Sequence, residues 1–173
     1  MKTSTIKKVT KEYLTDFVSL IYPQLCAACG KSLYKSESAI CTCCRYELPK
    51  TQFHLEDDNP VSRIFWGKVN IKAAAAFYFF NKGTRVQRLI HLLKYRSRTD
   101  VGLTIGEWLG GALKESLLFT GIEAVVAVPL HPKKLRIRGY NQSDLIAEGL
   151  SKALGVPVIK GALARSTNTG TQT

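Results

Sequence analysis

The 173-residue sequence contains no hydrophobic run long enough to cross a membrane. The apolar stretch from Phe17 to Tyr22 is far shorter than the roughly 20 residues of a membrane-spanning helix. Glu12 and Asp16 interrupt the position at which a signal peptide has its apolar core. These absences predict a cytoplasmic protein without a transmembrane segment. Apolar residues near the N-terminus recur at helical spacing, so we expect residues 1–21 to form an amphipathic helix that packs on the protein itself.

Several sequence motifs of enzymes are also absent. There is no Walker G-x-x-x-x-G-K-[ST] loop and no G-x-G-x-x-G fingerprint, which argues against an ATPase or a Rossmann oxidoreductase. The sequence also lacks an HExxH motif, a G-x-S-x-G motif and an obvious pair of carboxylates. The histidines, His54, His91 and His131, are isolated from one another, which is more typical of structural positions. No catalytic residue is therefore predicted.

Acidic residues are scarce, with 13 Asp and Glu against 25 Lys and Arg and a net charge of +12. A strong positive charge predicts an anionic partner, which could be nucleic acid, a phosphorylated metabolite or acidic lipid. The alternative is a charge that only keeps the protein soluble. The positions of the basic residues in the fold decide between these interpretations.

Cysteine is absent from the chain except within residues 26–44, where all five cysteines lie. Two C-x-x-C pairs, separated by eleven residues, contain Cys26, Cys29, Cys41 and Cys44. This spacing predicts four convergent thiolates, the tetrahedral sulfur set of zinc and iron sites. Disulfides would need an oxidising compartment, and an odd number of cysteines argues against them. We predict structural zinc rather than an iron–sulfur cluster, because nothing else in the sequence indicates electron transfer.

The residues around the cysteine pairs agree with a compact metal-binding turn. Gly30 directly follows the first pair, where a tight turn needs a residue that tolerates positive φ. Four thiolates around Zn²⁺ carry a net charge of about −2. The basic residues nearby in sequence that could offset this charge are Lys31, Lys35 and Arg45. Cys43 is the odd thiol, and we interpret it as a spare or alternative ligand.

Downstream of the cysteines, the sequence pattern alternates between extended and helical segments. Residues 48–68 are polar and interrupted by proline, which is typical of a linker. Residues 69–83 indicate one or two strands that close in a turn. Residues 84–98 predict an amphipathic helix with Thr84 able to cap its start. Residues 103–119 predict a second helix, in which Gly106 and Gly110 permit another element to approach closely.

Residues 124–159 have the pattern of a strand, a helix and a second strand. Ala124 to Leu130 are all apolar, as in a parallel strand that is buried on both faces. This βαβ unit predicts an α/β fold with a parallel sheet, in which ligands bind beyond the carboxyl ends of the strands. The segment in that position, HPKKLRIRGYNQ, is basic. We therefore expect a phosphate-binding loop there, with a merely solvated loop as the alternative.

A second concentration of basic residues occupies residues 81–100, which contain a single acid, Asp100. The candidates for contacts with nucleic-acid phosphates are Arg85, Arg88, Lys94, Arg96 and Arg98. Tyr95, Tyr140 and Trp66 are candidates for stacking on bases.

Five stretches of the chain together resemble the ComF family of phosphoribosyltransferase-like proteins, which is linked to natural competence. They are YPQLCAACGK, AICTCCRYELP, LIHLLKYR, VPLHPKKLRIRGYNQSDLIAEGLSKALGVPV and LARSTNTGTQT, and they follow the family order. The resemblance implies an α/β fold with a type I phosphoribosyltransferase-like parallel sheet behind a small zinc ribbon or knuckle. The implied domains are the N-terminal helix at 1–21, a four-cysteine zinc module at 22–50 and a phosphoribosyltransferase-like domain at 51–173.

The resemblance also implies a site and its ligands. The loop after Val128 and Pro129 would meet the pyrophosphate of phosphoribosyl pyrophosphate, and residues 165–173 would begin a mobile loop over the site. The implied pyrophosphate-binding residues are Lys133, Lys134, Arg136, Arg138, Asn141 and Gln142. The family's acidic ribose-phosphate strand lies beyond the last matching stretch. We therefore expect a C-terminally truncated, inactive chain, with Mg²⁺ and phosphoribosyl pyrophosphate bound only by a full-length protein.

Two functions remain open at this point. The first is an enzyme of the phosphoribosyltransferase type, in which basic residues stabilise the departing pyrophosphate. The second is a non-catalytic module that reuses the fold to hold single-stranded DNA during uptake. Other competence proteins are then further expected partners.

Overall fold

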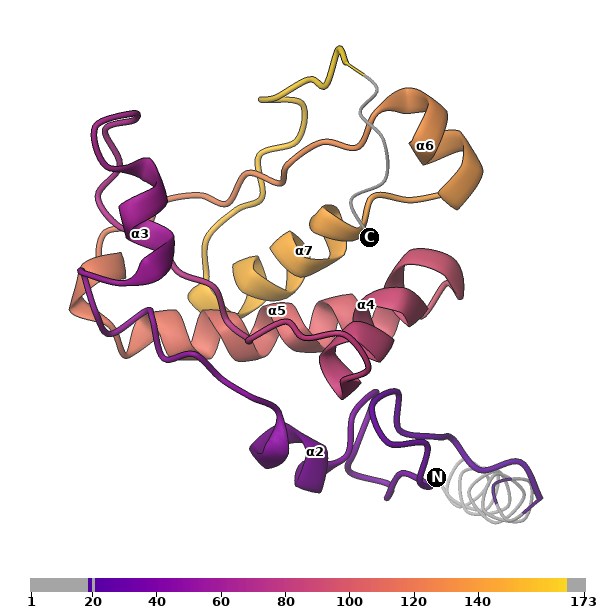
Figure 1. The fold of residues 1–173 in the computed structure, drawn as a ribbon. Helices are drawn as coiled ribbons and strands as arrows, with labels where there is room; N and C mark the ends of the chain where they lie inside the picture. The colour runs from indigo at the N-terminus through magenta and orange to yellow at the C-terminus, as the bar shows by residue number, and fades with distance from the viewer. Residues whose placement is uncertain (1–18, 20, 168–173) are drawn as a thin grey trace, which may run out of the picture.

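The computed structural model describes Ser19 and residues 21–167 (Figure 1). Its helices are α2 (Thr42–Glu47), α3 (Pro60–Phe65), α4 (Arg85–Tyr95), α5 (Thr99–Lys114), the 3₁₀ helix η1 (Leu117–Phe119), α6 (Pro132–Arg138) and α7 (Gln142–Leu154). The helix expected over residues 1–21 lies outside the described residues, apart from Ser19 and Ile21. No helix in the described ranges is long and apolar enough to cross a membrane.

Helices α5 and α7 pack side by side through glycines rather than through large side chains (Figure 1). A Cβ atom on Gly106 would lie 2.2 Å from the carbonyl oxygen of Ile146, and one on Gly110 would lie 2.6 Å from the Cβ of Ala153. A Cβ on Gly149 would lie 2.2 Å from the carbonyl oxygen of Leu103. The close approach predicted from Gly106 and Gly110 is therefore confirmed.

Strand pairing within the described residues is limited to isolated bridges. Two of them are antiparallel, Leu25 with Ser32 and Lys50 with Tyr78, and the third is parallel, Val125 with Val158. The parallel bridge joins the segments before and after α7, as expected for a strand–helix–strand unit. The apolar segment of residues 124–130 is not buried on both faces, since Val126 is 42% and Val128 is 63% exposed. Within the described residues, Val125 is the position of this segment that forms a bridge, with Val158.

The segment predicted as a linker, residues 48–68, contains helix α3. Asn59 begins this helix, and its side-chain oxygen accepts hydrogen bonds from the backbone N–H groups of Val61 and Ser62. Its amide nitrogen donates to the carbonyl oxygens of Phe53 and Ala74, so the side chain is fully buried yet satisfied. The linker prediction was wrong here, because a buried capping asparagine organises the polar, proline-containing sequence.

Helix α4 begins and ends within the predicted range and buries Val86, Leu89 and Leu93. Thr84 is the N-cap residue, but its hydroxyl does not cap the helix and instead donates to the carbonyl oxygen of Asn81. The buried face of α4 belongs to the main hydrophobic cluster of the protein. That cluster also contains residues of the cysteine segment, which lies against α4 and α5 (Figure 1).

Candidate functional site

The four cysteines of the two C-x-x-C pairs converge in space. The Sγ atoms of Cys26, Cys29, Cys41 and Cys44 all lie within 4.8 Å of one another. The Sγ atoms of Cys29 and Cys41 are 3.7 Å apart, close to the edge of about 3.8 Å expected for a tetrahedron with metal–sulfur distances of about 2.3 Å. All five cysteines are free thiols, and Cys43 is exposed. The cluster is close enough to hold a metal ion, and its sulfur donors suit a soft or borderline metal.

Backbone geometry brings the two cysteine pairs together. Gly30 has a φ of +80° and donates its N–H to the carbonyl oxygen of Cys26, which closes the first turn. Cys41 is the N-cap residue of α2, and Cys44 follows in that helix. The N–H of Cys41 donates to the Sγ of Cys26 at 3.2 Å, so the second pair is bonded directly to the first.

The thiols of the cluster have unequal proton affinities. Burial alone would raise the pKa of Cys26, but backbone N–H groups of Cys29, Cys41 and Ala28 stabilise its thiolate and bring the pKa down to about 6. Burial raises the pKa of Cys41 and Cys44. Hydrogen bonds with neighbouring sulfurs raise the pKa of Cys44 further, whereas the backbone N–H of Cys44 acts against the rise at Cys41. The cluster therefore favours a single thiolate at Cys26, and a cation would be needed to hold several thiolates together.

Two arginines interact electrostatically with the cysteine cluster: Arg85 of α4 and Arg98, the residue before α5. The pKa of Arg85 is raised by its hydrogen bond to Glu47 and also by the sulfur of Cys44. The pKa of Arg98 is raised mainly by its bidentate pair with Asp100 and, to a smaller degree, by Cys26. The arginines that offset thiolate charge thus come from helices distant in sequence.

Residues nearer in sequence contribute differently from what was expected. The guanidinium of Arg45 lies over the Trp108 ring, 5.3 Å from its centroid, where it joins α2 to α5. Lys31 and Lys35 are exposed. Three members of the predicted nucleic-acid set, Arg85, Arg88 and Arg98, lie near the cysteine segment.

The basic segment at residues 131–138 is a short helix, α6, and not the loop expected from the sequence. The Nδ1 atom of His131 accepts a hydrogen bond from the backbone N–H of Lys133, Pro132 takes the first helical position, and Gly139 ends the helix with a φ of +78°. The helix separates the basic side chains, because Lys134 and Arg136 are roughly 200° apart around its axis. Lys134 and Arg138, one turn apart, are half-buried, whereas Lys133 and Arg136 are exposed.

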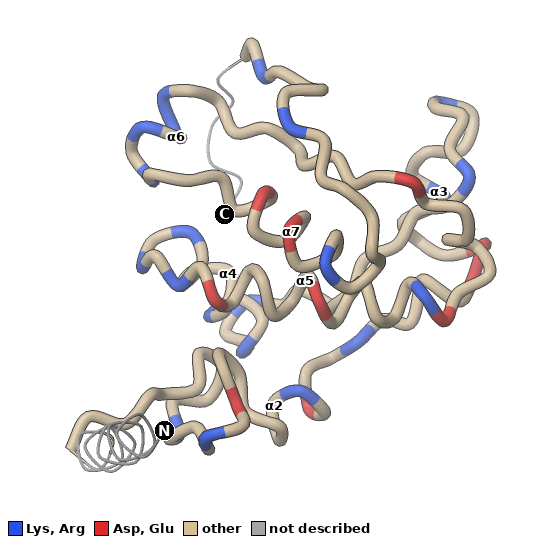
Figure 2. Tube along the Cα trace, turned by 180° about the vertical axis from the view of Figure 1, so that it is seen from behind, with Lys and Arg blue, Asp and Glu red and all other residues tan. Residues whose placement is uncertain are grey.

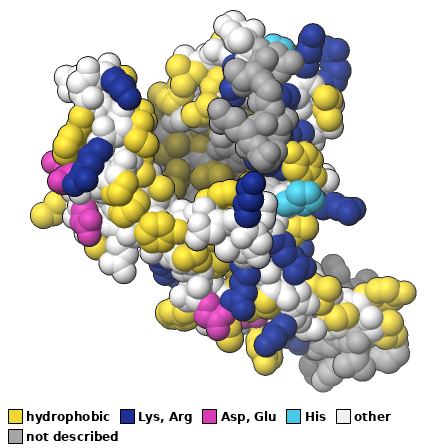
Figure 3. All heavy atoms as spheres, in the orientation of Figure 1, with side chains coloured by type: hydrophobic (Ala, Val, Ile, Leu, Met, Phe, Trp, Pro, Cys, Tyr) yellow, Lys and Arg dark blue, Asp and Glu magenta, His cyan; other side chains and the backbone are white. Residues whose placement is uncertain are grey.

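A cleft of about 470 Å³ lies between the C-terminal end of α4 and α6. We call it the basic cleft, and its lining residues are Lys94, Tyr95, Ser97, Lys134, Ile137 and Arg138. No acidic residue is among them. Figure 2 shows the basic positions of α6 lying across from those at the end of α4. Lys and Arg side chains gather on this side of the molecule in Figure 3.

Several contacts fix the two walls of the basic cleft. The Arg138 guanidinium lies 5.4 Å from the centroid of the Tyr95 ring and donates a hydrogen bond of 3.0 Å to the Oε1 of Gln142. The hydroxyl of Tyr140 donates to the carbonyl oxygen of Leu93, which ties the segment after α6 to α4. The cleft thus joins Lys94, from the predicted nucleic-acid set, to Lys134 and Arg138, from the predicted pyrophosphate set.

The other predicted residues lie away from this cleft or have structural contacts. Arg96 is exposed at the C-cap of α4, and Arg88 is exposed on the helix itself. Of the three aromatic candidates, only Tyr95 lines the basic cleft, because Tyr140 is hydrogen-bonded to α4 and Trp66 ends α3. Ser97 and Ile137 also line the basic cleft and were not among the predicted site residues. The local sequence has no motif that marks them, since they become neighbours only when α4 and α6 meet.

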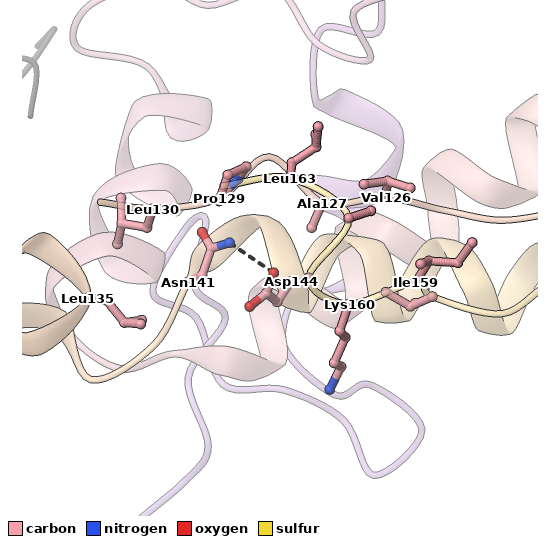
Figure 4. Close-up of a pocket in the computed structure, with 13 residues that line it drawn as sticks. Val126, Ala127, Pro129, Leu130, Leu135, Asn141, Asp144, Ile159, Lys160 and Leu163 are labelled. Atoms are coloured by element: carbon pink, nitrogen blue, oxygen red, sulfur yellow. Dashed lines mark hydrogen bonds between the residues drawn. The ribbon is translucent and has the colours of Figure 1, made fainter. Parts of the chain in front are cut away.

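A second cavity, of about 190 Å³, lies beside the apolar segment of residues 124–130 (Figure 4). Its walls are mostly apolar, and Lys160 is the only basic residue that lines it in the described part of the chain. Asn141 is at its edge, where its side chain donates to the carbonyl oxygen of Val128 and to Asp144. Asn141 also caps α7. It therefore positions the start of α7 against residues 124–130, and the basic side chains of α6 do not line this cavity.

Comparison with known proteins identifies relatives named for DNA use and competence. DNA utilization protein YhgH of Escherichia coli (strain K12) is 27% identical over 156 residues, which cover 86% of this chain and 63% of that protein. Its counterpart from Shigella flexneri is 26% identical over the same length. Competence protein F of Haemophilus influenzae is 30% identical over 87 residues, 49% of this chain and 38% of that protein.

The chain spans about 63% of the length of the YhgH relatives that it matches. No family model and no solved structure matches it. The similarity to YhgH and to Competence protein F supports a relationship between this chain and the ComF family.

Proposed function

We propose that this chain binds single-stranded DNA through the surface that α4 and α6 form around the basic cleft. The observation that carries the proposal is the convergence of Lys94, Lys134 and Arg138 from two helices around a half-exposed tyrosine. Proteins that bind single strands without sequence preference combine a positively charged groove with aromatic side chains on which bases stack. The basic cleft has both components.

Electrostatics support a polyanion as the ligand. The chain carries a net charge of +12, and acids are absent from the lining of the basic cleft. Each phosphate that a Lys or Arg neutralises releases condensed counterions, which drives the association at low salt. The names of the relatives, DNA utilization protein and Competence protein F, agree with this ligand class.

We propose a zinc ion at Cys26, Cys29, Cys41 and Cys44, with a structural role. Four protein ligands leave no open position for substrate or water, as in structural rather than catalytic zinc sites. A bound zinc ion would supply the cross-link between the two cysteine pairs. The shared hydrophobic cluster then transmits that order to Val86 and Leu89 of α4, and so to the helix that carries Lys94 and Tyr95.

A second candidate function is binding of phosphoribosyl pyrophosphate or pyrophosphate by a phosphoribosyltransferase-like domain. The parallel bridge between Val125 and Val158, on either side of α7, supports this alternative. So does the position of α6 directly after residues 124–130, with Lys133 and Arg136 on its exposed side. Mg²⁺ would accompany such a ligand.

Fluorescence anisotropy with a labelled oligothymidylate tests the proposal. The double variant Lys94→Glu/Lys134→Glu should weaken binding strongly, because it places two negative charges on facing walls of the basic cleft. Lys68→Glu/Lys72→Glu is a matched control with the same charge change in the segment that follows α3, a helix on the opposite side of the molecule from α6 (Figure 2). Equal losses in both variants would indicate diffuse attraction and contradict the proposal. Competition by pyrophosphate, but not by sulfate, would favour the second candidate.

A further inference from the structure

Tyr95 occupies an unusual position for an aromatic side chain in a charged region. It is 49% exposed at the end of α4, and it lines the basic cleft together with the alkyl side chain of Ile137. The His91 ring, one turn earlier, lies 4.8 Å from the Tyr95 ring between centroids. An aromatic wall of this kind has no use in binding a simple inorganic anion, which interacts with charge alone.

We infer that the basic cleft holds one nucleotide of a single strand, with its base against the part of the Tyr95 ring that Arg138 and His91 leave exposed and its phosphate between Lys94 and Lys134. This inference rests on the proposed DNA binding and names the part of the surface that recognises a base. The volume of about 470 Å³ falls within the range of roughly 300–1,000 Å³ that is typical of small-ligand pockets.

The walls of the cleft are held in place before a ligand arrives. Arg138 is hydrogen-bonded to Gln142 and lies over Tyr95, so its guanidinium is restrained on two sides. The hydroxyl of Tyr140 connects the end of α6 to Leu93 of α4. Ser97 has a φ of +51° directly after α4, and the Tyr95 side chain beside it is 49% exposed. Restraint of this kind lowers the entropy lost on binding.

The same lining predicts how selective the cleft is. Aromatic stacking tolerates every base, because each base has a π-face. Among the lining side chains, only the hydroxyls of Tyr95 and Ser97 and the charged groups can hydrogen-bond to a base edge. We therefore expect little discrimination between bases but a clear difference between a strand with bases and a strand without them.

The test measures the affinity of two labelled strands of equal length, oligothymidylate and an abasic deoxyribose-phosphate strand, for the full chain. The wild type should prefer the strand with bases by roughly 5- to 150-fold, the range that corresponds to stacking of one base. Tyr95→Ala should remove that preference, and Tyr95→Phe should retain it. Tyr34→Ala is the matched control, because Tyr34 is exposed and lies in the cysteine segment.

The outcomes separate the inference from the proposed function. If Tyr95→Ala keeps the wild-type preference for bases, the nucleotide site is wrong although DNA binding stands. If the wild type binds neither strand at low salt, both are wrong. Free thymidine monophosphate can also be added as a competitor of oligothymidylate. If it displaces the strand at an equal concentration of nucleotides, the cleft binds a free nucleotide and the single-strand inference is overturned. Thermal melting of each variant establishes that a lost preference is not lost folding.

Discussion

The guanidinium of Arg88 lies against Gly30: a Cβ atom on Gly30 would be 3.4 Å from its Nη2 atom. Gly30 closes the turn of the first cysteine pair, and Arg88 lies on the helix that ends at the basic cleft. The cysteine cluster and the proposed DNA surface are therefore built on the same helix. Loss of order at the cysteines should therefore also destabilise α4.

This contact predicts that Arg88 supports metal binding. Arg88→Glu should weaken zinc affinity by roughly tenfold or more, the lower end of the effect typical of outer-shell partners, because it places negative charge beside the thiolates. Arg96→Glu, the same change at the exposed C-cap of α4, should leave zinc affinity nearly unchanged. Competition with a chromophoric chelator measures both affinities. Equal zinc affinities in the two variants would show that Arg88 does not support the site.

The ligand set leads to a second prediction. Cys44→Ser should lose the metal, and Cys43→Ser should keep about one zinc per chain, because Cys43 is exposed and outside the cluster. Structural zinc contributes roughly 10–16 kcal/mol of apparent binding free energy in small modules. Its removal should therefore expose backbone amides of residues 22–48 and also of α4. Elemental analysis and hydrogen exchange make the two measurements, and retention of metal by Cys44→Ser would refute the assignment.

The stability of the metal-free chain should depend on pH through Cys26. Its pKa is lowered from 9.0 to about 6 by backbone N–H donors, although burial opposes the shift. Between about pH 6 and 9 the unfolded chain binds a proton that the folded chain has released, so the free energy of unfolding should rise with pH. This contribution disappears as pH falls through 6. The raised pKa values of Cys41 and Cys44 act in the opposite direction only above pH 9.

Denaturant titrations from pH 5 to 9 in the presence of a chelator test this dependence. Cys26→Ser should flatten the rising limb, whereas Cys43→Ser should preserve it. A wild-type profile that is flat or falls over this range would contradict the predicted thiolate.

Helices α4, α5 and α7 and the cysteine cluster could be predicted from sequence because local patterns determine them. The apolar spacing in residues 84–98 is a property of α4 alone, and the two C-x-x-C turns bring their own thiols together. Gly106 and Gly110, four residues apart, marked the face of α5 that α7 approaches. For the helices the signal lies within a few helical turns, and for the cysteine cluster it lies within residues 26–44.

The features that sequence reasoning missed depend on contacts between distant segments. The Asn59 side chain that caps helix α3 is buried and donates a hydrogen bond to the carbonyl oxygen of Ala74. The polar, proline-containing sequence of residues 48–68 does not indicate this contact. Helix α6 looked like a loop because charges crowd a short segment, although His131 and Gly139 cap it. The basic cleft joins Lys94 to Lys134, forty residues apart, so neither basic run identified it by itself.

The glycine contact between α5 and α7 predicts a large difference between two identical substitutions on one helix. Gly106→Ala should lower the free energy of unfolding by about 1–3 kcal/mol or more, because its Cβ would overlap the carbonyl oxygen of Ile146. A Cβ on Gly111 would have no atom within 4 Å. Gly111→Ala should therefore raise the free energy of unfolding by up to about 1 kcal/mol, because alanine has the higher helix propensity. Urea denaturation compares the two variants. Similar effects of both changes would mean that α5 and α7 do not pack at this distance.

Photo-crosslinking locates the DNA contact without relying on any variant. An oligonucleotide that carries 4-thiothymidine is irradiated with the wild-type chain at low salt, and the modified peptides are identified by mass spectrometry. We predict adducts in residues 89–98 and 132–140, the two segments that form the walls of the basic cleft. Adducts confined to residues 22–83, or no adducts under conditions in which the strand is bound, would contradict the proposal that α4 and α6 hold single-stranded DNA.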